Sequence, residues 1–305
     1  MKIISFRTSA GADRVGVLTD AGIADLTPFA GEGKGHSPIR RLLHAIDDGL
    51  VLDDALLARC DDHESSAVTV APLIPDPGKI VAAPVNYRDH QSEMNEDFNI
   101  DALGVFLKAP TSVIAHGGII RLPYDDRRFD QEGEFAVVIG TTARDVSVEE
   151  AAGVIAGYTC LLDITMRGGE DRSTRKSFDT FTPVGPWLVT PDEVGSTADL
   201  RLRTTVNGVL RQDADIADLI WGVPELIAYA SSVMTLLPGD IVTTGTPAGI
   251  GQIHDGDSIS VEINRVGALT VAVSSDGAVA CPTRGANRGP KPPAEITPVR
   301  DRIGA

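Results

Sequence analysis

Short apolar runs separated by turn-forming residues make up the hydrophobic pattern at the start of the chain. They predict strands at residues 2–7, 14–19 and 22–26, followed by helices at 39–47 and 53–60. Strands and helices of this length, taken together, indicate a small α/β module. None of its residues forms a pattern typical of catalysis.

The pattern breaks at residues 71–78, where three prolines and one glycine resist regular structure. We therefore predict a domain boundary here, between an N-terminal module of residues 1–72 and a larger domain of residues 73–281. The last stretch, residues 282–305, is rich in Arg, Gly and Pro. This composition favours a flexible C-terminal tail.

The larger domain continues the pattern of short strands, with few helices. A helix is predicted at residues 146–156, where acidic residues fall in the first turn, and another at 221–232. Asn207-Gly208 separates two β-type runs and is a strong signal for a two-residue hairpin. The stretch 166–176 is polar and contains glycine, so it is predicted to be a loop.

The most informative stretch is an acidic cluster that runs directly into an apolar strand. Residues 136–139 have the composition of a buried strand. If the extended chain reaches back to Glu132, then Glu132 and Glu134 share one face of the sheet, about 6–7 Å apart, and Gly133 leaves the opposite face open. Two such carboxylates repel each other unless a cation lies between them. A divalent-metal site is one interpretation, and a solvated acidic edge strand is the other.

A second apolar run supplies a candidate third ligand. Residues 157–165 are mostly apolar and contain one acid, Asp163. A carboxylate in such a strand requires a partner, because an unpaired buried charge is costly. A cation held by Glu132 and Glu134 would provide that partner.

A polar segment after the strand that begins at residue 79 carries His90 and Glu93, three residues apart. If the segment is helical, both side chains lie on one face and touch, which is the arrangement of a general base with an orienting carboxylate. The following residues 94–101 are polar and have little to bury, so they are a candidate lid. The alternative is an exposed helix in which this pair has no catalytic role.

Composition narrows the class of protein. With 305 residues, 42% hydrophobic and 23% charged, the chain is long enough for one large domain and one small one. A formal net charge of −16 argues against a nucleic-acid partner, because phosphate binding requires a basic face. No apolar run approaches the length of a membrane span or a signal peptide, so we expect no membrane association and a cytoplasmic protein. The three cysteines show no metal-binding or disulfide spacing.

Several motifs follow one another in a fixed order along the chain. They are Asn86-Tyr87-Arg88-Asp89-His90 with Glu93, Phe106-Leu107-Lys108, Glu132-Gly133-Glu134, Gly157-Tyr158-Thr159 with Asp163, Lys176-Ser177-Phe178-Asp179, Gly185-Pro186-Trp187 and Thr244-Gly245-Thr246-Pro247-Ala248-Gly249. Each is weak alone, but the ordered set, over residues 79–273, resembles the fumarylacetoacetate hydrolase family. The resemblance implies an α+β fold that is mostly β, with a catalytic domain of mixed β-sheets and short helices.

The resemblance also implies a metal and a reaction. Glu132, Glu134 and Asp163 match the residues with which the family binds Mg²⁺ or Mn²⁺, hard cations that prefer oxygen ligands. The implied substrate is a small 2-oxo acid, an acylpyruvate such as fumarylpyruvate, whose carbon–carbon bond is hydrolysed in the catabolism of aromatic compounds. Relatives in this family are usually dimers, so a homodimer is expected.

Roles for individual residues follow from the same resemblance. His90, oriented by Glu93, would activate a water that attacks the 4-carbonyl, and Lys176 would stabilise the pyruvate enolate beside the metal. Thr246 matches a position that contacts substrate. The plainer alternatives are that Lys176 is an exposed loop lysine and that Thr246 satisfies a turn.

One departure from the family pattern concerns the substrate. Many members carry Arg-Asp-x-Gln where this chain has Arg167-Gly168-Gly169-Glu170. Arg167 and Glu170 are predicted to face the substrate, and a carboxylate at Glu170 would repel an anionic substrate unless Arg167, Arg172 or Arg175 neutralises it. This departure therefore concerns the choice of substrate and not the metal ligands.

Other reactions share the same metal-stabilised enolate. The family includes isomerases, hydratases and decarboxylases of 2-oxo acids, such as 2-hydroxyhepta-2,4-diene-1,7-dioate isomerase and oxaloacetate decarboxylase. The presence of both His90 and Glu93 favours hydrolysis over these only modestly, because the same two residues can move protons in an isomerase. A metal-dependent binding protein without turnover is a third reading, from a different class.

Overall fold

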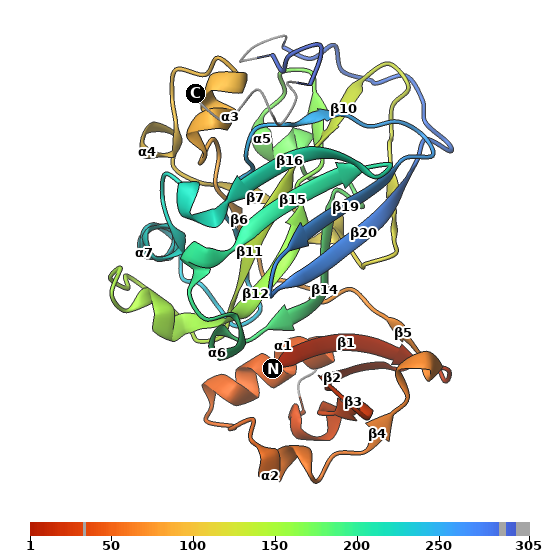
Figure 1. Cartoon of the computed structure of the whole chain (residues 1–305), viewed down its shortest axis with the longest axis vertical. Helices are drawn as coiled ribbons and strands as arrows, with labels where there is room; N and C mark the ends of the chain where they lie inside the picture. The colour runs from red at the N-terminus through yellow and green to blue at the C-terminus, as the bar shows by residue number, and fades with distance from the viewer. Residues whose placement is uncertain (33–34, 287–290, 297–305) are drawn as a thin grey trace.

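Three β-sheets form the framework of the protein, for which a computed structural model describes residues 1–32, 35–286 and 291–296 (Figure 1). The largest sheet has 12 strands. Along its main path the strands are β4 (Asp62–His63), β3 (Gly22–Asp25), β2 (Asp13–Thr19), β1 (Lys2–Thr8), β14 (Thr182–Val189), β12 (Ile155–Leu162), β11 (Gly133–Ile139), β17 (Ile241–Thr243), β6 (Ile80–Ala82) and β7 (Phe106–Lys108), with β5 (Val68–Val70) beside β1 and β8 (Val113–Ile114) beside β14.

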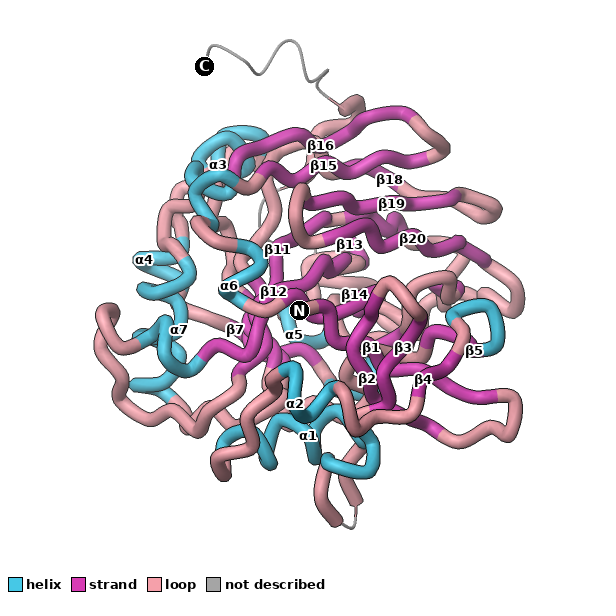
Figure 2. The backbone as a smooth tube through the Cα atoms, turned by 60° about the horizontal axis from the view of Figure 1, so that its bottom comes forward, coloured by secondary structure: helices cyan, strands magenta, loops and turns pink. Residues whose placement is uncertain are grey.

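The two smaller sheets and the short helices complete the fold. The five-stranded sheet contains β16 (Val209–Asp215), β15 (Arg201–Val206), β19 (Ser258–Ile263), β20 (Gly267–Ser274) and β9 (Ile119–Arg121), and the three-stranded sheet contains β13 (Thr165–Arg167), β10 (Arg128–Gln131) and β18 (Gly251–Gln252). The helices are α1 (Pro38–Asp47), α2 (Asp54–Leu57), α3 (Arg88–Glu93), α4 (Ile100–Leu103), α5 (Arg172–Arg175), α6 (Pro191–Val194) and α7 (Val223–Val233). Figure 2 shows strands throughout and helices confined to short pieces. The prediction of a mostly β fold with mixed sheets and short helices is confirmed.

The alternation of side chains along β11 separates a core face from a site face. Phe135 and Val137 belong to the apolar core that also contains residues of the five-stranded sheet. Ala136 and Val138 belong to a second core, which they share with the N-terminal strands. Because successive side chains of a strand point to opposite faces, Glu134 lies on the face of Ala136 and Val138. The acidic face and the main core face are therefore opposite sides of one strand.

Two local predictions have clear outcomes. The hairpin is confirmed, since Asn207 and Gly208 connect β15 to β16 with φ of 53° and 77°, as a type I′ turn requires. The helix predicted at residues 146–156 is wrong. Only a 3₁₀ turn, Ala151–Val154, forms there, and β12 begins at Ile155. Strand pairing with β11 outweighs the weak local helix preference.

The predicted loop at residues 166–176 is only partly irregular. It begins with the end of strand β13 and contains helix α5. The Asp171 side chain starts this helix by accepting a hydrogen bond from the backbone N–H of Ser173 at 2.9 Å. A four-residue helix has too few positions to show a helical period, so the pattern of polar residues did not reveal it.

The N-terminal strands continue the sheet of the larger domain. β1 pairs antiparallel with β14, with Ile3 opposite Leu188. Figure 1 shows the N-terminal residues at one end of the molecule, next to the ends of β12 and β14. The boundary after residue 72 stays a prediction.

The described part of the C-terminal stretch contacts the larger domain. Arg128 Nη1 donates a hydrogen bond to the carbonyl oxygen of Pro293 at 3.1 Å. Residues 287–290 and 297–305, which fall within the predicted flexible tail, lie outside the described residues. None of the helices in the described part of the chain combines the length and the apolar character needed to span a bilayer.

Candidate metal centre and cavity

The ends of four strands bring the predicted site residues together. β17 runs parallel to β6 and antiparallel to β11, which in turn is antiparallel to β12. The carboxyl ends of β6, β12 and β17 and the amino end of β11 therefore meet at one edge of the large sheet. Segments far apart in the sequence, which follow or precede these strand ends, become neighbours there.

Three buried carboxylates lie at this edge. Glu132 immediately precedes β11, Glu134 is its second residue, and Asp163 immediately follows β12. The backbone N–H of Asp163 donates to the carbonyl oxygen of Glu132 at 2.8 Å, which holds the two residues opposite each other. One oxygen from each carboxylate lies within 4.8 Å of the others, and each residue is at most 5% exposed. We call these three residues the carboxylate triad.

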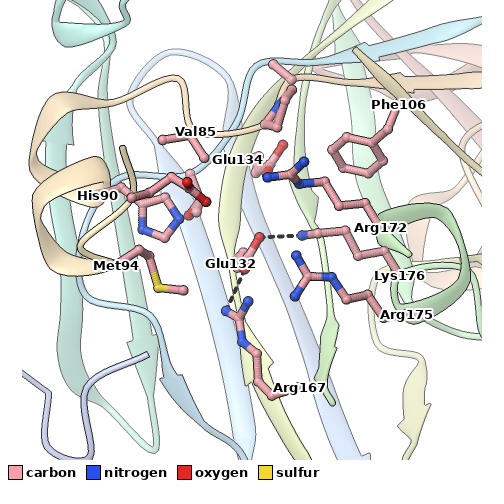
Figure 3. A pocket seen from close by; sticks show the side chains of 14 residues that line it. Val85, His90, Met94, Phe106, Glu132, Glu134, Arg167, Arg172, Arg175 and Lys176 are labelled. Carbon is pink, nitrogen blue, oxygen red and sulfur yellow. Dashed lines mark hydrogen bonds and ion pairs between the residues drawn. The ribbon is translucent and has the colours of Figure 1, made fainter. Parts of the chain in front are cut away.

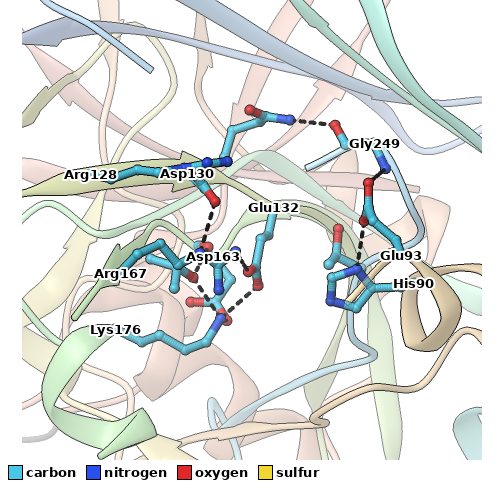
Figure 4. A network of polar contacts seen from close by, with 12 residues as sticks. His90, Glu93, Arg128, Asp130, Glu132, Asp163, Arg167, Lys176 and Gly249 are labelled. Atoms are coloured by element: carbon cyan, nitrogen blue, oxygen red, sulfur yellow. Dashed lines mark hydrogen bonds and ion pairs between the residues drawn. The ribbon is translucent and has the colours of Figure 1, made fainter. Parts of the chain in front are cut away.

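Three cations neutralise two members of the triad, and Figure 4 labels Lys176 and Arg167 among them. Lys176 Nζ donates to Glu132 and Asp163, at 2.6 Å in each case. Arg167 Nη2 donates to Glu132 Oε1 at 2.7 Å, and Lys108 Nζ donates to Asp163 Oδ1. The carboxylate of Glu134 instead accepts from the hydroxyl of Thr243 and from a backbone N–H. Glu134 thus has no direct cationic partner in the described part of the chain.

The two glutamates differ in pKa for this reason. Burial raises the pKa of the Glu132 carboxyl, but Lys176 and Arg167 outweigh burial and hold it far below its usual range. Burial, followed by the negative charge of Asp163, raises the pKa of Glu134 to about 8. A buried group of acids in which one member keeps its proton near neutral pH is suited to a further cation. Three oxygen donors at this spacing fit Mg²⁺ or Mn²⁺.

His90 and Glu93 lie on the short helix α3, next to the glycine-rich loop that follows β17. His90 Nδ1 and Glu93 Oε2 are 3.0 Å apart, and Glu93 Oε1 accepts a hydrogen bond from the backbone N–H of Gly249 at 2.8 Å. The His90 residue is 7% exposed. The predicted contact between the two side chains is present in the structure, and the carboxylate that makes it is fixed in turn by the loop.

A cavity with about 470 Å³ of empty space, partly open to solvent, connects these groups (Figure 3). Its lining residues come from β11, from the segments that follow β6 and β17, and from β7, β13, α3 and α5 with the residues next to them. They are Ala83, Pro84, Val85, His90, Met94, Glu96, Phe106, Glu132, Glu134, Arg167, Arg172, Arg175, Lys176 and Thr246. The basic residues of α5 and Lys176 occupy one wall, and His90 lies across the cavity from them.

Of the three residues predicted to contact the substrate, Arg167 and Thr246 line the cavity and Glu170 does not. Arg167 lines the cavity, although its guanidinium group also donates to Asp130 at 2.8 Å. Thr246 lines the cavity too, and its hydroxyl donates to the carbonyl oxygen of Gly133 at 2.9 Å. Glu170 does not line this cavity, and its Oε1 accepts from the Thr283 hydroxyl at 2.9 Å. Contact of these three residues with a substrate stays a prediction.

Two residues that organise the site were given no role from sequence. Lys108, 2% exposed, pairs with Asp163. Gln212, fully buried on β16, accepts from the backbone N–H of Gly133 at 2.9 Å and donates to Thr246 Oγ1 at 2.7 Å. Lys108 belongs to a motif that the sequence displayed, but Gln212 lies in a strand with no local signal. Only the position of β16 next to β11 shows that Gln212 connects Gly133 to Thr246.

The fold and this site together define a class of protein, mostly β with a buried carboxylate centre that fits a divalent metal. The family model named fumarylacetoacetate (FAA) hydrolase C-terminal matches residues 79–274. The chain belongs to the fumarylacetoacetate hydrolase family, which confirms the resemblance found in the motifs.

Relatives with assigned activities differ in the reaction that they catalyse. The maleylpyruvate hydrolase of Aquipseudomonas alcaligenes is 43% identical over 240 residues, which cover 73% of this chain and 84% of that protein. A bifunctional isomerase/decarboxylase of 4-hydroxyphenylacetate degradation from Salmonella dublin is 42% identical over 197 residues, 63% of this chain and 46% of that protein. The chain is thus similar both to a hydrolase and to an enzyme of the alternative reactions.

A solved structure carries both a metal and a small organic acid. The maleylpyruvate hydrolase from Sphingobium sp. SYK-6, in complex with manganese(II) ion and pyruvate, has a TM-score of 0.76 and 36% identity, covering 92% of this chain and 100% of that chain. Together with the buried carboxylate triad, this relative supports a divalent-metal site here. The choice between Mg²⁺ and Mn²⁺ stays a prediction.

Proposed function

We propose that this protein is a divalent-metal-dependent hydrolase that cleaves a carbon–carbon bond of a 2,4-dioxo acid. The substrate is an acylpyruvate such as fumarylpyruvate, the products are pyruvate and a carboxylic acid, and the setting is the catabolism of aromatic compounds. The observation that carries the proposal is the buried contact of His90 with Glu93, because His90 lines the same cavity as Glu132 and Glu134 of the carboxylate triad. Similarity to two maleylpyruvate hydrolases supports it.

His90 is the general base of this proposal. Its Nδ1 is occupied by Glu93, so Nε2 is the nitrogen that accepts a proton from water in the cavity. The water oxygen then bonds to C4, the C3–C4 bond breaks, and its electron pair forms the enolate of pyruvate. Protonation at C3 gives pyruvate, and C4 leaves as the carboxylic acid. Glu93 stabilises the imidazolium during this transfer.

The remaining groups bind and stabilise negative charge. Glu132, Glu134 and Asp163 hold the metal, which supplies Lewis acidity at the 2-oxo oxygen when it is bound. Lys176 Nζ, already 2.6 Å from oxygens of Glu132 and Asp163, lies beside the position at which the enolate charge develops. This arrangement requires no nucleophilic side chain.

The second candidate is an isomerase or decarboxylase of a 2-oxo acid on the same centre, and the similarity to the bifunctional isomerase/decarboxylase favours it. Such a reaction needs the triad and Lys176 but no hydrolytic water. His90 separates the hydrolase from a decarboxylase, because only the hydrolase requires it to make a nucleophile from water.

The test is an assay of the purified protein with Mg²⁺ or Mn²⁺, and again with EDTA, on acetylpyruvate, fumarylpyruvate and oxaloacetate. Pyruvate and carbon dioxide are measured separately. We expect pyruvate with the matching carboxylic acid, an activity that EDTA abolishes and that His90→Ala lowers by about 10²-fold or more. Carbon dioxide from oxaloacetate that survives His90→Ala would instead identify the decarboxylase. No product from any of the three substrates would contradict the hydrolase and the decarboxylase and would favour an isomerase or a binding protein.

The proposal includes a cytoplasmic homodimer. The expected mass in solution is twice that of the 32.1 kDa chain. Light scattering coupled to size exclusion measures it, and a monomer at the working concentration would contradict this part alone.

A further inference from the structure

Helix α5 (Arg172–Arg175) places two guanidinium groups on one wall of the cavity. Arg172 and Arg175 are three residues apart, so they lie on the same face of the helix. Both line the cavity. Figure 3 shows them above and below Lys176 and across the cavity from His90.

The other cations of the cavity already have acidic partners. Lys176 contacts Glu132 and Asp163, each at 2.6 Å. Arg167 contacts Glu132 at 2.7 Å and Asp130 at 2.8 Å. The positive charges of Lys176 and Arg167 are therefore already compensated by the triad and by Asp130.

Arg172 and Arg175 differ from them. Within the described residues, neither side chain makes a salt bridge or a hydrogen bond, and Nε of Arg175 is buried without a partner. Burial, followed by repulsion from Arg167, lowers the pKa of Arg175 to about 10, so the group stays charged at neutral pH. The cavity wall thus holds two positive charges that none of the described residues compensates by direct contact.

An anionic ligand would compensate them. A guanidinium group that is partly removed from water is best stabilised by a carboxylate, which accepts two parallel hydrogen bonds from it. Under the proposed function, the 2-oxo acid end of the substrate lies at the carboxylate triad, so its own carboxylate is accounted for. The two unpaired arginines therefore match a further acidic group.

We propose that Arg172 and Arg175 form a subsite for a second carboxylate, at the end of the substrate away from its 2-oxo acid group. The inference rests on the proposed function and restricts the class of substrates within it. The preferred substrates are dicarboxylic 2-oxo acids, and acyl tails that end in a methyl group bind more weakly. These arginines determine specificity and take no part in bond cleavage.

Two stable ligands of equal chain length test the subsite without catalysis. 2-Oxoadipate ends in a carboxylate and 2-oxohexanoate in a methyl group, and neither has the 4-carbonyl that hydrolysis requires. Calorimetry on the Mn²⁺-loaded enzyme gives the Kd of each. We expect wild-type protein to bind 2-oxoadipate at least about tenfold more tightly, as a desolvated charge-assisted contact provides.

The variants are Arg172→Gln, Arg175→Gln and the double variant, with Arg172→Lys and Arg175→Lys as conservative partners. The glutamine variants should reduce the ratio of the two Kd values to within about twofold of one, while the Kd of 2-oxohexanoate is unchanged. The lysine variants should retain an intermediate ratio of the two Kd values. An ammonium group keeps the positive charge but cannot donate two parallel hydrogen bonds to one carboxylate. Arg144→Gln is the control for loss of one charge, since that side chain is exposed and outside the cavity.

Each outcome decides a different point. If the glutamine variants raise the Kd of both ligands by the same factor, the arginines bind the 2-oxo acid carboxylate and the proposed subsite for a second carboxylate is wrong. An unchanged ratio in all variants, with Mn²⁺ affinity intact, also overturns it. If wild-type protein binds neither ligand, the failure belongs to the proposed function. If a double variant does not fold, the single variants still give the ratio.

Discussion

Glu134 has a protonation equilibrium set by its position. Burial and the nearby Asp163 raise its pKa to about 8, whereas an exposed glutamate titrates near 4.5. Between these two values the folded, metal-free protein keeps a proton that the unfolded chain has lost. Stability falls with rising pH wherever the folded state binds more protons, so Glu134 contributes a destabilisation that grows from about pH 4.5 to 8. A divalent cation bound by Glu134 would displace this proton and remove the cost.

Substitution of Glu134 by Gln should therefore stabilise the metal-free protein at alkaline pH. In EDTA we expect a similar Tm for wild type and variant at pH 5, and a Tm at least about 3 °C higher for the variant at pH 8, the shift that roughly 1 kcal/mol produces. Added Mn²⁺ should raise the Tm of the wild type and have little effect on the variant. Thermal unfolding followed by circular dichroism measures each value.

Glu132 provides the matched control, because its pKa is shifted in the opposite direction. Lys176 and Arg167 outweigh burial and hold this pKa low. A carboxylate of this kind stabilises the folded state above about pH 4.5 and loses that contribution as the pH falls. Glu132→Gln should accordingly lower the Tm at pH 8 in EDTA. Shifts of the same sign for both glutamine variants at pH 8 would show that the two electrostatic environments are not distinct.

Glu93 is expected to act on the rate and not on binding. Its carboxylate joins His90 Nδ1 to the backbone N–H of Gly249 and so fixes the orientation of the imidazole. Glu93→Gln should lower kcat by about 10²-fold or more, with KM within about threefold of wild type and an unchanged Tm. Steady-state kinetics on fumarylpyruvate measures both constants. A loss confined to KM would assign Glu93 to substrate binding instead.

Single residues were predictable from sequence where spacing alone fixes geometry. Glu132 and Glu134 share a face because they are two apart near a strand, and His90 meets Glu93 because they are three apart on a helix. The acidic partner of Lys108, Asp163, was not predictable. The tip of a long side chain reaches a place that depends on several packed elements, which no local period encodes.

At the scale of elements, Gly133 controls how closely two sheets approach. A Cβ at this position would lie 2.0 Å from Thr204 Oγ1 on β15 and 3.1 Å from Gln212 Oε1 on β16. The absence of a side chain allows the five-stranded sheet to pack directly behind the carboxylate triad. The sequence indicated that Gly133 opens this face, but not which residues would fill it.

Gly133→Ala should lower the free energy of unfolding by about 2 kcal/mol, as overpacking of a rigid core typically does. Thr204→Ala alone should be nearly neutral, because the buried hydroxyl of Thr204 has no hydrogen-bond partner in the described part of the chain. The double variant should recover more than half of the loss, since it removes the closest clash. Urea unfolding of the wild type, the two single variants and the double variant measures the four free energies of unfolding that this double-mutant cycle requires. Strictly additive effects would contradict a direct clash between the two residues.

Elements with strong local signals were predicted and weak ones were not. The Asn207-Gly208 hairpin formed because both residues tolerate positive φ. The helix expected at residues 146–156 did not form, since the pairing of β12 with β11 begins at Ile155. Helix α5, which carries the cavity arginines, is too short for its period to be recognised. Local preference is decisive only where tertiary pairing does not compete with it.

At the scale of the whole molecule, the sheet and one apolar core connect the N-terminal module to the centre. Ile3 and Val17 share a core cluster with Ala136, Val138 and Leu161. The last three come from β11 and β12, the same strands that carry the triad. The sequence predicted β1, β2 and β3 of the module but not β4 and β5. Its pattern also contained no information on which strand of the larger domain β1 would pair with.

Removal of residues 1–72 should therefore prevent the rest from folding. The truncation would expose the apolar side chains of β11 and β12 that face the module and leave β14 with an unpaired edge, and such surfaces aggregate. We expect residues 73–305 alone to be insoluble or to lack a cooperative thermal transition. Coexpression with residues 1–72 as a separate chain should restore a soluble complex that binds Mn²⁺, because both partners of the interface are then present. A soluble 73–305 fragment with a cooperative transition and full Mn²⁺ affinity would show instead that the catalytic domain folds independently of the module.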